Sequence, residues 1–323
     1  MNLSQDNKRR LGMSVENERV EDYFGEKYYT SFERSSTSVY MLSLDGTRQY
    51  KVIDTHTHSY NEQSIKWTEG WGFCVYFDGT SEELIKSMDV TGIYKSVIVP
   101  YGSDELRALN QDYGSLADAR RVNDQIARAV DRRPDRLIGF ADIPHLRGHE
   151  VLDEIDRAVS VLRLKGIGHF SLEPVDVTAE IVEKAAELRV PIDVGASSLY
   201  TVLGEVAPSY PEVRFKGSNF CHARLHVKSL VDRASKVLTS NANVWADISM
   251  ALAQQPEKCI AVMKDVGFDK FVYGSDFPVL GYVPEHELNL LFRHAEIEKV
   301  SPEDLDKVLC GNAEKFLGLS TTT

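Results

Sequence analysis

The sequence predicts an α/β protein built as a (β/α)8 TIM barrel, with an N-terminal extension ahead of it. Short β-branched segments alternate with amphipathic segments about eight times over roughly 270 residues, which is the repeat number and length of such a barrel. No glycine-rich phosphate loop follows the first strand, which weakens a doubly wound open sheet as the alternative. Polar residues follow the first and last predicted strands, at the barrel mouth where sites lie in this architecture.

Length and composition limit the possible domain organisation, partners and cellular location of the protein. The chain has 323 residues, and residues 50–319 are expected to form the barrel. Residues 1–49 are predicted to be an extension whose polar first part is disordered and whose aromatic second part packs on the barrel. The net charge of −12 argues against nucleic acid and anionic membranes as partners. The 4 cysteines form no CxxC pair, and neither a signal peptide nor a membrane-spanning run is found, so we expect a cytoplasmic protein.

The first predicted strand carries two histidines at its end. Val52 and Ile53 are apolar and β-branched, as in a buried strand, and His56 and His58 follow at alternate positions. Side chains alternate across a strand, so both imidazoles project from the same side and can share one metal ion. With 9 histidines in the chain such a pair also arises by chance, so it needs support from elsewhere in the sequence.

The last predicted strand supplies a carboxylate. Residues 270–274 form an apolar run that is followed by Asp276 and is broken at Pro278. Two histidines and one aspartate at strand ends make a three-ligand set that leaves one metal position open. The sequence therefore predicts a metal site formed by His56, His58 and Asp276.

The remaining elements follow from β-branched runs, capping signals and proline stops. A hairpin with a turn at Asp45-Gly46 is expected to lead into the first strand. Further strands are predicted at residues 96–100, 136–143, 164–172, 190–194, 213–220, 244–249 and 271–274. Helices are predicted at residues 80–88, 114–132, 150–161, 179–189, 226–238, 256–266 and 285–298, with a last one capped by Ser301.

The connection after the first strand is rich in aromatic residues, among them Trp71. Such a loop at a barrel mouth is typical of a substrate-pocket wall or lid, so Trp71 is a candidate substrate-binding residue. A plain hydrophobic cap over the barrel is the competing interpretation.

Several motifs together resemble those of the amidohydrolase-related (amidohydrolase 2) family. That family includes aminocarboxymuconate-semialdehyde decarboxylase, the resorcylate-type decarboxylases and many metal-dependent hydrolases. The pieces that carry the resemblance, spread over residues 50–319, are Asp54-Thr55-His56-Thr57-His58, Asn123-Asp124, Pro134-Asp135-Arg136-Leu137-Ile138-Gly139-Phe140-Ala141, His222, Tyr273-Gly274-Ser275-Asp276-Phe277-Pro278 and Gly311-Asn312-Ala313.

The resemblance implies a barrel of the metal-dependent hydrolase type, with His56, His58 and Asp276 at the metal and His222 as the catalytic imidazole. It also shows a departure, because the family places a further histidine ligand at the end of the fifth strand. Here Gly195 takes that place by our count, and Asp193 lies on the same face one strand repeat deeper. The two histidines and Asp276 can still hold one Zn2+, with or without His222, or the site has lost its metal.

Three functions fit these residues. Metal-assisted hydrolysis of a small polar substrate, carboxylated or cyclic, is the leading hypothesis, with Asp276 taking the proton from water and His222 polarising the carbonyl. The alternative is non-oxidative decarboxylation, in which Asp276 or His222 delivers a proton and Arg224 binds the substrate carboxylate. A barrel that has lost catalysis and only binds a ligand is the third. In each case the partner is a small molecule, and a homodimer is one option for assembly.

Overall fold

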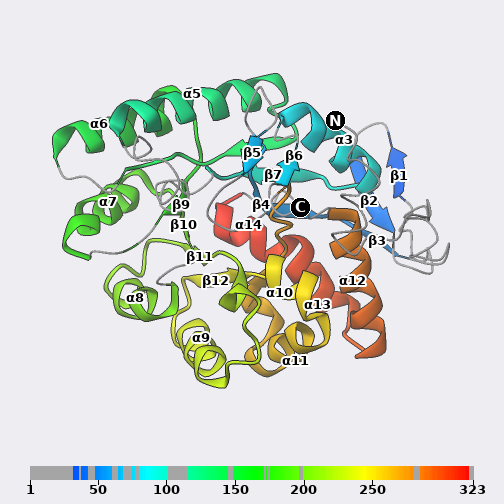
Figure 1. Ribbon diagram of the computed structural model, residues 1–323. Coiled ribbons are helices and arrows are strands. Elements are labelled where there is room, and N and C mark those ends of the chain that lie inside the picture. The colour runs from blue at the N-terminus through cyan, green and yellow to red at the C-terminus, as the bar shows by residue number, and fades with distance from the viewer. Residues whose placement is uncertain are drawn as a thin grey trace, which may run out of the picture.

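The computed structural model describes residues 32–35, 38–42, 48–59, 65–67, 75–77, 80–100, 115–144, 148–170, 172, 175–195, 199–278 and 284–319. Eight parallel strands lie at the centre of this described part (Figure 1). They are β4 (Ile53–Thr57), β7 (Lys95–Ile98), β8 (Leu137–Gly139), β9 (Ile167–Phe170), β10 (Ile192–Val194), β11 (Phe215–Gly217), β12 (Val244–Asp247) and β13 (Phe271–Val272).

The strands follow one another around a ring in chain order. One sheet has the order β4-β7-β8 and the other β13-β12-β11-β10-β9. Isolated parallel bridges join the two sheets at both edges, Ala141 to Ile167 on one side and Thr57 to Phe277 on the other. Because parallel neighbours connected through helices in a closed order define a (β/α)8 barrel, the fold predicted from the sequence is confirmed.

Helices surround the strands on the outside of the ring (Figure 1). They are α3 (Ser81–Thr91), α5 (Leu116–Arg132), α6 (His149–Asp156), α7 (Val175–Leu188), α8 (Leu199–Val206), α9 (Lys228–Ser240), α10 (Ser249–Gln254), α11 (Pro256–Val266), α12 (Pro284–Ile297), α13 (Pro302–Asp306) and α14 (Asn312–Leu317). Two of them begin as the sequence predicts, because Thr80 accepts a hydrogen bond from the Glu83 backbone N–H and Ser301 caps α13 in the same way.

The described strands and helices differ from the predicted ones mainly at their ends. Barrel strands are two to five residues long in the structure, shorter than several of the predicted apolar runs, because the flanking residues are buried without joining the ladder. Two helices, α8 and α10, were not predicted. Both are short and lie after strands β10 and β12, in segments to which the sequence analysis assigned no helix.

Antiparallel pairs lie outside the ring of parallel strands. β1 (Phe32–Ser35), β2 (Ser38–Leu42) and β3 (Gln49–Tyr50) form one such sheet, and Met41 pairs with Tyr50 between β2 and β3. β5 (Ile65–Trp67) and β6 (Val75–Phe77) form another. The predicted Asp45-Gly46 turn, and most of the extension over residues 1–49, lie outside the described residues.

The barrel interior is filled by a small apolar cluster at one end and by the polar site at the other. Ile53, Val97 and Val272 point inward, and Phe316 of α14 packs against them. The Phe316 ring centroid lies 6.0 Å from that of Phe140 and 6.3 Å from that of Trp245. α14 therefore closes the end of the barrel at which the strands begin, and leaves the carboxyl ends of the strands for the site.

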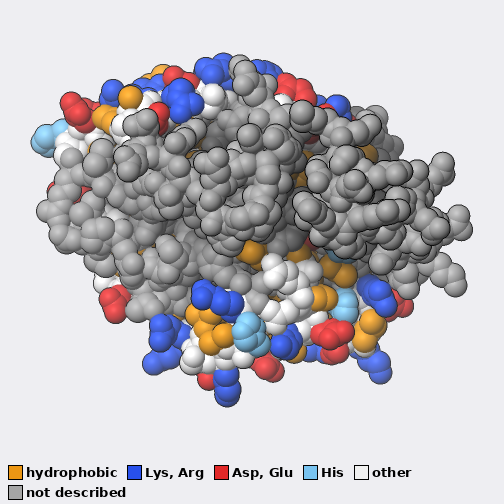
Figure 2. All heavy atoms as spheres, viewed as in Figure 1, with side chains coloured by type: hydrophobic (Ala, Val, Ile, Leu, Met, Phe, Trp, Pro, Cys, Tyr) orange, Lys and Arg blue, Asp and Glu red, His pale blue; other side chains and the backbone are white. Residues whose placement is uncertain are grey.

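The surface of the described part is charged and mixed in sign. Figure 2 shows basic and acidic side chains interspersed along its lower edge, in the region of α9 and α11. Among the described residues, none of the helices has the length and apolar character that would let it cross a membrane.

Candidate metal centre

Strand β4 and the residue after it place two imidazoles side by side inside the barrel. The Nε2 atoms of His56 and His58 lie 3.0 Å apart, and both side chains are buried. Asp276, which follows β13, brings its Oδ1 to 3.0 Å from His58 Nε2 and 3.4 Å from His56 Nε2. The structure therefore brings together the three groups that the sequence singled out, with their ligand atoms all within 4.8 Å of one another.

The neighbouring strands β4 and β13 fix this geometry through backbone contacts. The Asp276 N–H donates to the carbonyl of His56, and the His58 N–H donates to the carbonyl of Phe277. Asp276 has a φ of 58°, in the left-handed region that aspartate tolerates better than most residues. Gly274 is required two residues earlier, because a Cβ there would lie 2.9 Å from His56 Cβ.

Each imidazole is held in the tautomer that leaves Nε2 able to bind a cation. His56 Nδ1 lies 3.0 Å from Asp247 Oδ2, and His58 Nδ1 lies 3.2 Å from the Val99 carbonyl oxygen. Both Nδ1 atoms therefore donate, and both Nε2 atoms face Asp276 Oδ1, where their lone pairs can bind a metal ion in place of a proton. Two imidazole nitrogens and one carboxylate oxygen in this arrangement suit a divalent transition-metal ion, with one or more positions left for other ligands.

Without a metal, the two imidazoles differ in their affinity for a proton. Burial disfavours the charged form of His56, but the carboxylates of Asp247 and Asp276 outweigh it and raise the pKa to about 9. Burial and the charge of His56 hold the pKa of His58 well below its ordinary value. Without a metal, the surrounding carboxylates thus favour a protonated His56 imidazole at the point where a metal cation would bind.

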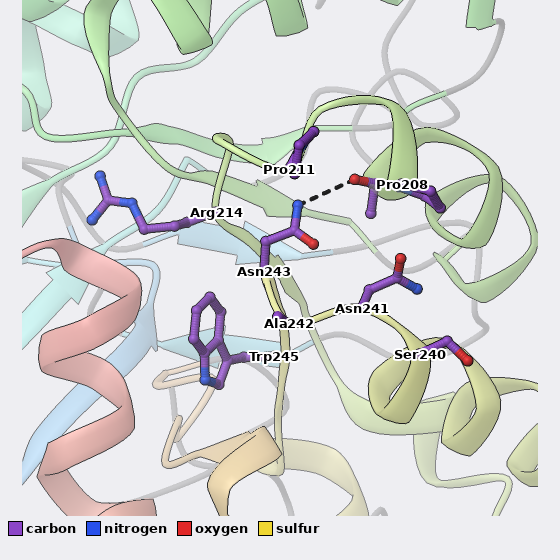
Figure 3. Close-up of a pocket in the computed structure, with 9 residues that line it drawn as sticks. Pro208, Pro211, Arg214, Ser240, Asn241, Ala242, Asn243 and Trp245 are labelled. Carbon is purple, nitrogen blue, oxygen red and sulfur yellow. Dashed lines mark hydrogen bonds between the residues drawn. The ribbon is translucent and has the colours of Figure 1, made fainter.

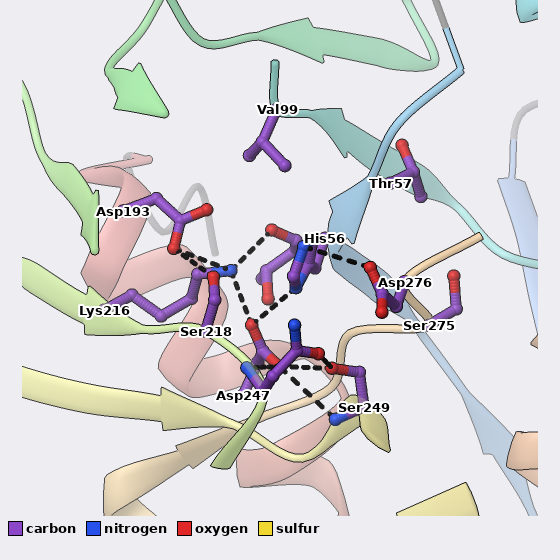
Figure 4. Close-up of polar contacts among 12 residues, drawn as sticks. His56, Thr57, Val99, Asp193, Lys216, Ser218, Asp247, Ser249, Ser275 and Asp276 are labelled. Carbon is purple, nitrogen blue, oxygen red and sulfur yellow. Dashed lines mark hydrogen bonds and ion pairs between the residues drawn. The ribbon is translucent and has the colours of Figure 1, made fainter. Parts of the chain in front are cut away.

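Asp247, at the end of β12, is the principal support of His56. Its Oδ2 also accepts a hydrogen bond from Lys216 Nζ at 2.9 Å, while its Oδ1 accepts from Ser249 Oγ at 2.7 Å and from the Asn219 N–H at 3.0 Å (Figure 4). Burial acts against the charged form, but Lys216 and His56 keep the pKa of Asp247 well below its ordinary value. Asp247 therefore remains an anion and fixes the orientation of the His56 ring.

Replacing Asp247 by asparagine is expected to weaken metal binding by about 10- to 100-fold, the usual cost of losing a partner behind a metal-binding histidine. The neutral asparagine side chain loses the charged hydrogen bond between Asp247 Oδ2 and His56 Nδ1–H. The proton of His56 is then less strongly fixed on Nδ1, so Nε2 is less available to bind the metal. Titration of the metal-free protein with Mn2+ measures the effect. Ser249→Ala is the matched control, because Ser249 contacts the Oδ1 side of Asp247 and leaves Oδ2 to His56; an equal loss in both variants would contradict the role of Oδ2.

Asp54 joins the two strands that carry the site. Its carboxylate accepts hydrogen bonds from the backbone N–H groups of His56 and Ser275 and from Ser275 Oγ at 2.6 Å. Burial raises the pKa of Asp54 to about 6 in spite of these bonds. Asp54 is not in the group of three metal ligands, and its hydrogen bonds connect β4 to the segment that carries Asp276.

Glu287 on α12 is a buried carboxyl group near these acids. It is fully buried, and neither of its side-chain oxygens has a hydrogen-bond partner in the part of the chain that the structure describes. Burial, and then the charges of Asp54, Asp276 and Asp247, raise the pKa of Glu287 well above its ordinary value. These surroundings therefore favour the protonated, uncharged form of Glu287.

Glu287→Gln is expected to stabilise the protein increasingly as the pH rises. A carboxyl group whose folded-state pKa is raised binds its proton more tightly when folded, so wild-type stability falls above the unfolded pKa by up to about 1.4 kcal/mol per pH unit. Glutamine removes this loss and should match the wild type near pH 4. Melting temperatures of both proteins at several pH values measure the difference. Glu285→Gln on the same helix, at a partly exposed position, should show no such gain, and a pH-independent difference for Glu287→Gln would contradict the assignment.

The other predicted site residues are not brought to the metal centre by the described structure. The backbone of His222 lies in a 3₁₀ turn, Phe220–Ala223, after β11, but its side chain is outside what is described, so its catalytic role stays a prediction. Arg224 ends this turn and is exposed. Trp71 lies outside the described residues.

The site also contains residues that the sequence interpretation missed, namely Asp247, Lys216 and Glu287. One signal was available for Lys216. Phe215 faces the outer core and Lys216 is its neighbour on β11, so alternation along the strand turns Lys216 into the barrel. A lysine in that position needs carboxylates around it, and Asp193 and Asp247 supply them at 3.4 Å and 2.9 Å.

Two hollows in the described surface lie away from this site. One, of about 540 Å³, is bordered by Arg214, Asn243 and Trp245 near the starts of β11 and β12 (Figure 3). Asn243 there is engaged with backbone carbonyls of Ala207, Tyr210 and Val213. The other, of about 620 Å³, lies beside the starts of β7 and β8. Both are at the opposite end of the barrel from His56, so neither is a candidate for the reaction site.

A (β/α)8 barrel with two histidines and an aspartate gathered at the carboxyl ends of its strands defines a metal-binding enzyme class. The sequence profile of the Amidohydrolase family matches residues 53–319. The chain therefore belongs to this family.

Individual relatives are more distant. A γ-resorcylate decarboxylase from Rhizobium radiobacter is 32% identical over 91 residues, which is 28% of each chain. A dihydroxybenzoic acid decarboxylase from Polaromonas, solved with bound manganese and an inhibitor, is 15% identical, with a TM-score of 0.59 over 84% of this chain and 97% of that one. A probable 2-pyrone-4,6-dicarboxylic acid hydrolase from Acinetobacter baumannii is 18% identical, with a TM-score of 0.56 over 83% of this chain and 99% of that one. At these identities the solved structures establish the shared fold.

Proposed function

We propose that this protein is a metal-dependent, non-oxidative decarboxylase of a small hydroxylated aromatic acid. The observation that carries the proposal is the convergence of His56 Nε2, His58 Nε2 and Asp276 Oδ1 on one point inside the barrel mouth. The partial sequence match to a γ-resorcylate decarboxylase favours carboxy-lyase chemistry over the hydrolysis that the sequence put first. The alternative reading of the sequence is thus the better supported one.

A divalent cation held by His56, His58 and Asp276 would act as a Lewis acid toward substrate oxygens. Asp276 is the carboxyl group at the centre; in this scheme its carboxylate first takes up a proton from a hydroxyl group of the bound substrate and is then the proton donor. It protonates the ring carbon that bears the carboxylate, the bond between that carbon and the carboxyl group breaks, and its electron pair restores the ring as carbon dioxide leaves. Burial of Asp276, which is 3% exposed, keeps competing water away from the proton transfer.

The identity of the metal belongs to this proposal. The sequence alone suggested Zn2+, whereas the Polaromonas structure contains manganese. Two imidazoles and one carboxylate accept either ion. Loading metal-free protein with Zn2+ or Mn2+ in separate samples, followed by metal analysis and assay, decides between them.

The reaction type is tested by its stoichiometry. Metal-loaded protein is incubated with a panel of mono- and dihydroxybenzoates, and carbon dioxide and the decarboxylated phenol are measured together. In D2O the product should carry one deuterium on the carbon that lost the carboxyl group. Carbon dioxide and phenol in equal amounts support the proposal, and a panel without turnover contradicts this substrate class.

Metal-assisted hydrolysis is the second candidate, because a hydrolase shares this fold. It would consume water, so incubation of cyclic esters in water enriched in 18O would place the label in the product carboxylate. Label incorporation without carbon dioxide release would favour hydrolysis and overturn the decarboxylase proposal. A homodimer, cytoplasmic location and the packing of residues 1–49 on the barrel remain predictions from the sequence.

A further inference from the structure

Asp193 on β10 has one carboxylate oxygen that is used and one that is not. The side chain is fully buried. Oδ1 accepts a hydrogen bond from Ser218 Oγ at 2.5 Å and lies 3.4 Å from Lys216 Nζ. Oδ2 is buried and has no hydrogen-bond partner within the described part of the protein. A buried carboxylate oxygen without a donor is costly, so its partner should be sought beyond the described residues.

The two described donors that contact Asp193 Oδ1 have no further hydrogen to donate. An ammonium group has three N–H donors, and Lys216 Nζ faces three acceptors, namely the Thr55 carbonyl oxygen at 2.9 Å, Asp247 Oδ2 at 2.9 Å and Asp193 Oδ1. Ser218 has one O–H, which it donates to Oδ1. Lys216 and Ser218, the two described donors at Asp193, therefore leave Oδ2 without a hydrogen bond.

Oδ2 faces the metal centre. In Figure 4 one oxygen of Asp193 is joined to Lys216 and Ser218, and the other is turned toward the barrel interior on the side of His56. The negative charge of Asp193 interacts electrostatically with His58 and favours its protonated form. Asp193 is nevertheless not a member of the group whose ligand atoms lie within 4.8 Å of one another, which among the described residues is His56, His58 and Asp276.

We propose that Asp193 Oδ2 accepts a hydrogen bond from an O–H group bound at the metal centre, and that Asp193 is thereby a further substrate-orienting residue. The inference rests on the metal site of the proposed function. The O–H donor is water in the resting protein or a hydroxyl group of the substrate in the complex. Asp193 therefore contacts the metal centre through this O–H group and does not bind the metal ion directly.

The proposal has a consequence for specificity. An anionic acceptor attracts a hydroxyl group and repels a carboxylate in the same place, so the substrate should bind with a hydroxyl toward β10 and its carboxylate away from it. A methyl ether in place of that hydroxyl has no hydrogen to donate and leaves Oδ2 unpartnered.

The test compares wild type with Asp193→Asn as full-length protein. Asparagine retains Oδ1 for Ser218 and Lys216 and replaces Oδ2 by an NH2 group, which cannot accept. Two quantities are measured, the Kd for Mn2+ from the signal of the free ion, and the ratio of the Kd values for 2-methoxybenzoate and salicylate on the Mn2+-loaded protein. If the O–H donor is a water molecule in the resting protein, the variant should bind Mn2+ about 10-fold more weakly. If the O–H donor is a hydroxyl group of the substrate, the preference of the variant for salicylate over 2-methoxybenzoate should fall by about 10-fold or more.

Ser218→Ala is the matched control, because it removes a contact to Oδ1 and leaves Oδ2 in place; both quantities should stay within about 2-fold of wild type. If Asp193→Asn does not fold, Asp193→Ser removes both carboxylate oxygens, and its two quantities are compared with those of Ser218→Ala, which loses only a contact to Oδ1. A variant that melts at a lower temperature but keeps both quantities would overturn the proposal, since Asp193 would then be structural. A wild type that fails to bind Mn2+ would instead contradict the proposed function itself.

Discussion

His58→Ala is expected to abolish metal binding at stoichiometric concentrations and to lower turnover by at least about 1,000-fold, well beyond the cost of losing a supporting residue. His58 is a cleaner choice than His56 because its Nδ1 donates to a backbone carbonyl, that of Val99, whereas Nδ1 of His56 holds the Asp247 carboxylate. Removing His58 leaves one imidazole and Asp276, too few groups for a tight site. Metal analysis after dialysis and the carbon dioxide assay measure the two effects.

His226→Ala is the matched control for a lost histidine, because His226 is exposed just ahead of α9. It should bind metal and turn over substrate as wild type does. Full activity in His58→Ala, with or without bound metal, would remove the centre of the proposed mechanism. A variant that retains metal but loses activity would instead place the metal on other residues and leave His58 as a catalytic group.

The fold was accessible from the sequence because its signals are local. Each strand or helix can be recognised from the hydrophobic pattern of its own residues. Capping residues such as Thr80 mark where helices begin. His56 and His58 could be paired for the same reason, since two residues along one strand share a face. Asp276 was linked to them because the last strand of a closed barrel returns to the first.

The support around these groups was not accessible, because it depends on which strands become neighbours and which way they face. Asp247 and Lys216 come from different strands and meet His56 and Thr55 only when the ring closes. Glu287 on α12 resembles a surface helix residue in the sequence, and only packing buries it. The expected role of Arg224 came from its distance to His222 along the chain, which does not determine exposure.

Lys216→Met is expected to destabilise the protein by about 3–5 kcal/mol, the cost of removing one partner from a buried ion pair. Burial alone would lower the pKa of Lys216, but Asp193 and Asp247 raise it, so the side chain is a permanent cation between two anions. Methionine has a similar length but leaves both carboxylates buried without their cation. Denaturant unfolding of wild type and variant, with metal removed from both, measures the loss.

Lys228→Met is the control variant, because it measures the change in stability when an exposed lysine is lost. Lys228 is 86% exposed and pairs with Asp232 at 2.8 Å, so its replacement should change stability by less than about 1 kcal/mol. The double variant Lys216→Met/Asp193→Asn should be more stable than Lys216→Met alone, because one of the two uncompensated charges is then neutral. If the double variant is instead the less stable of the two, the loss comes from packing around the lysine stem, and the charge of Lys216 is not what holds Asp193 and Asp247 in the barrel.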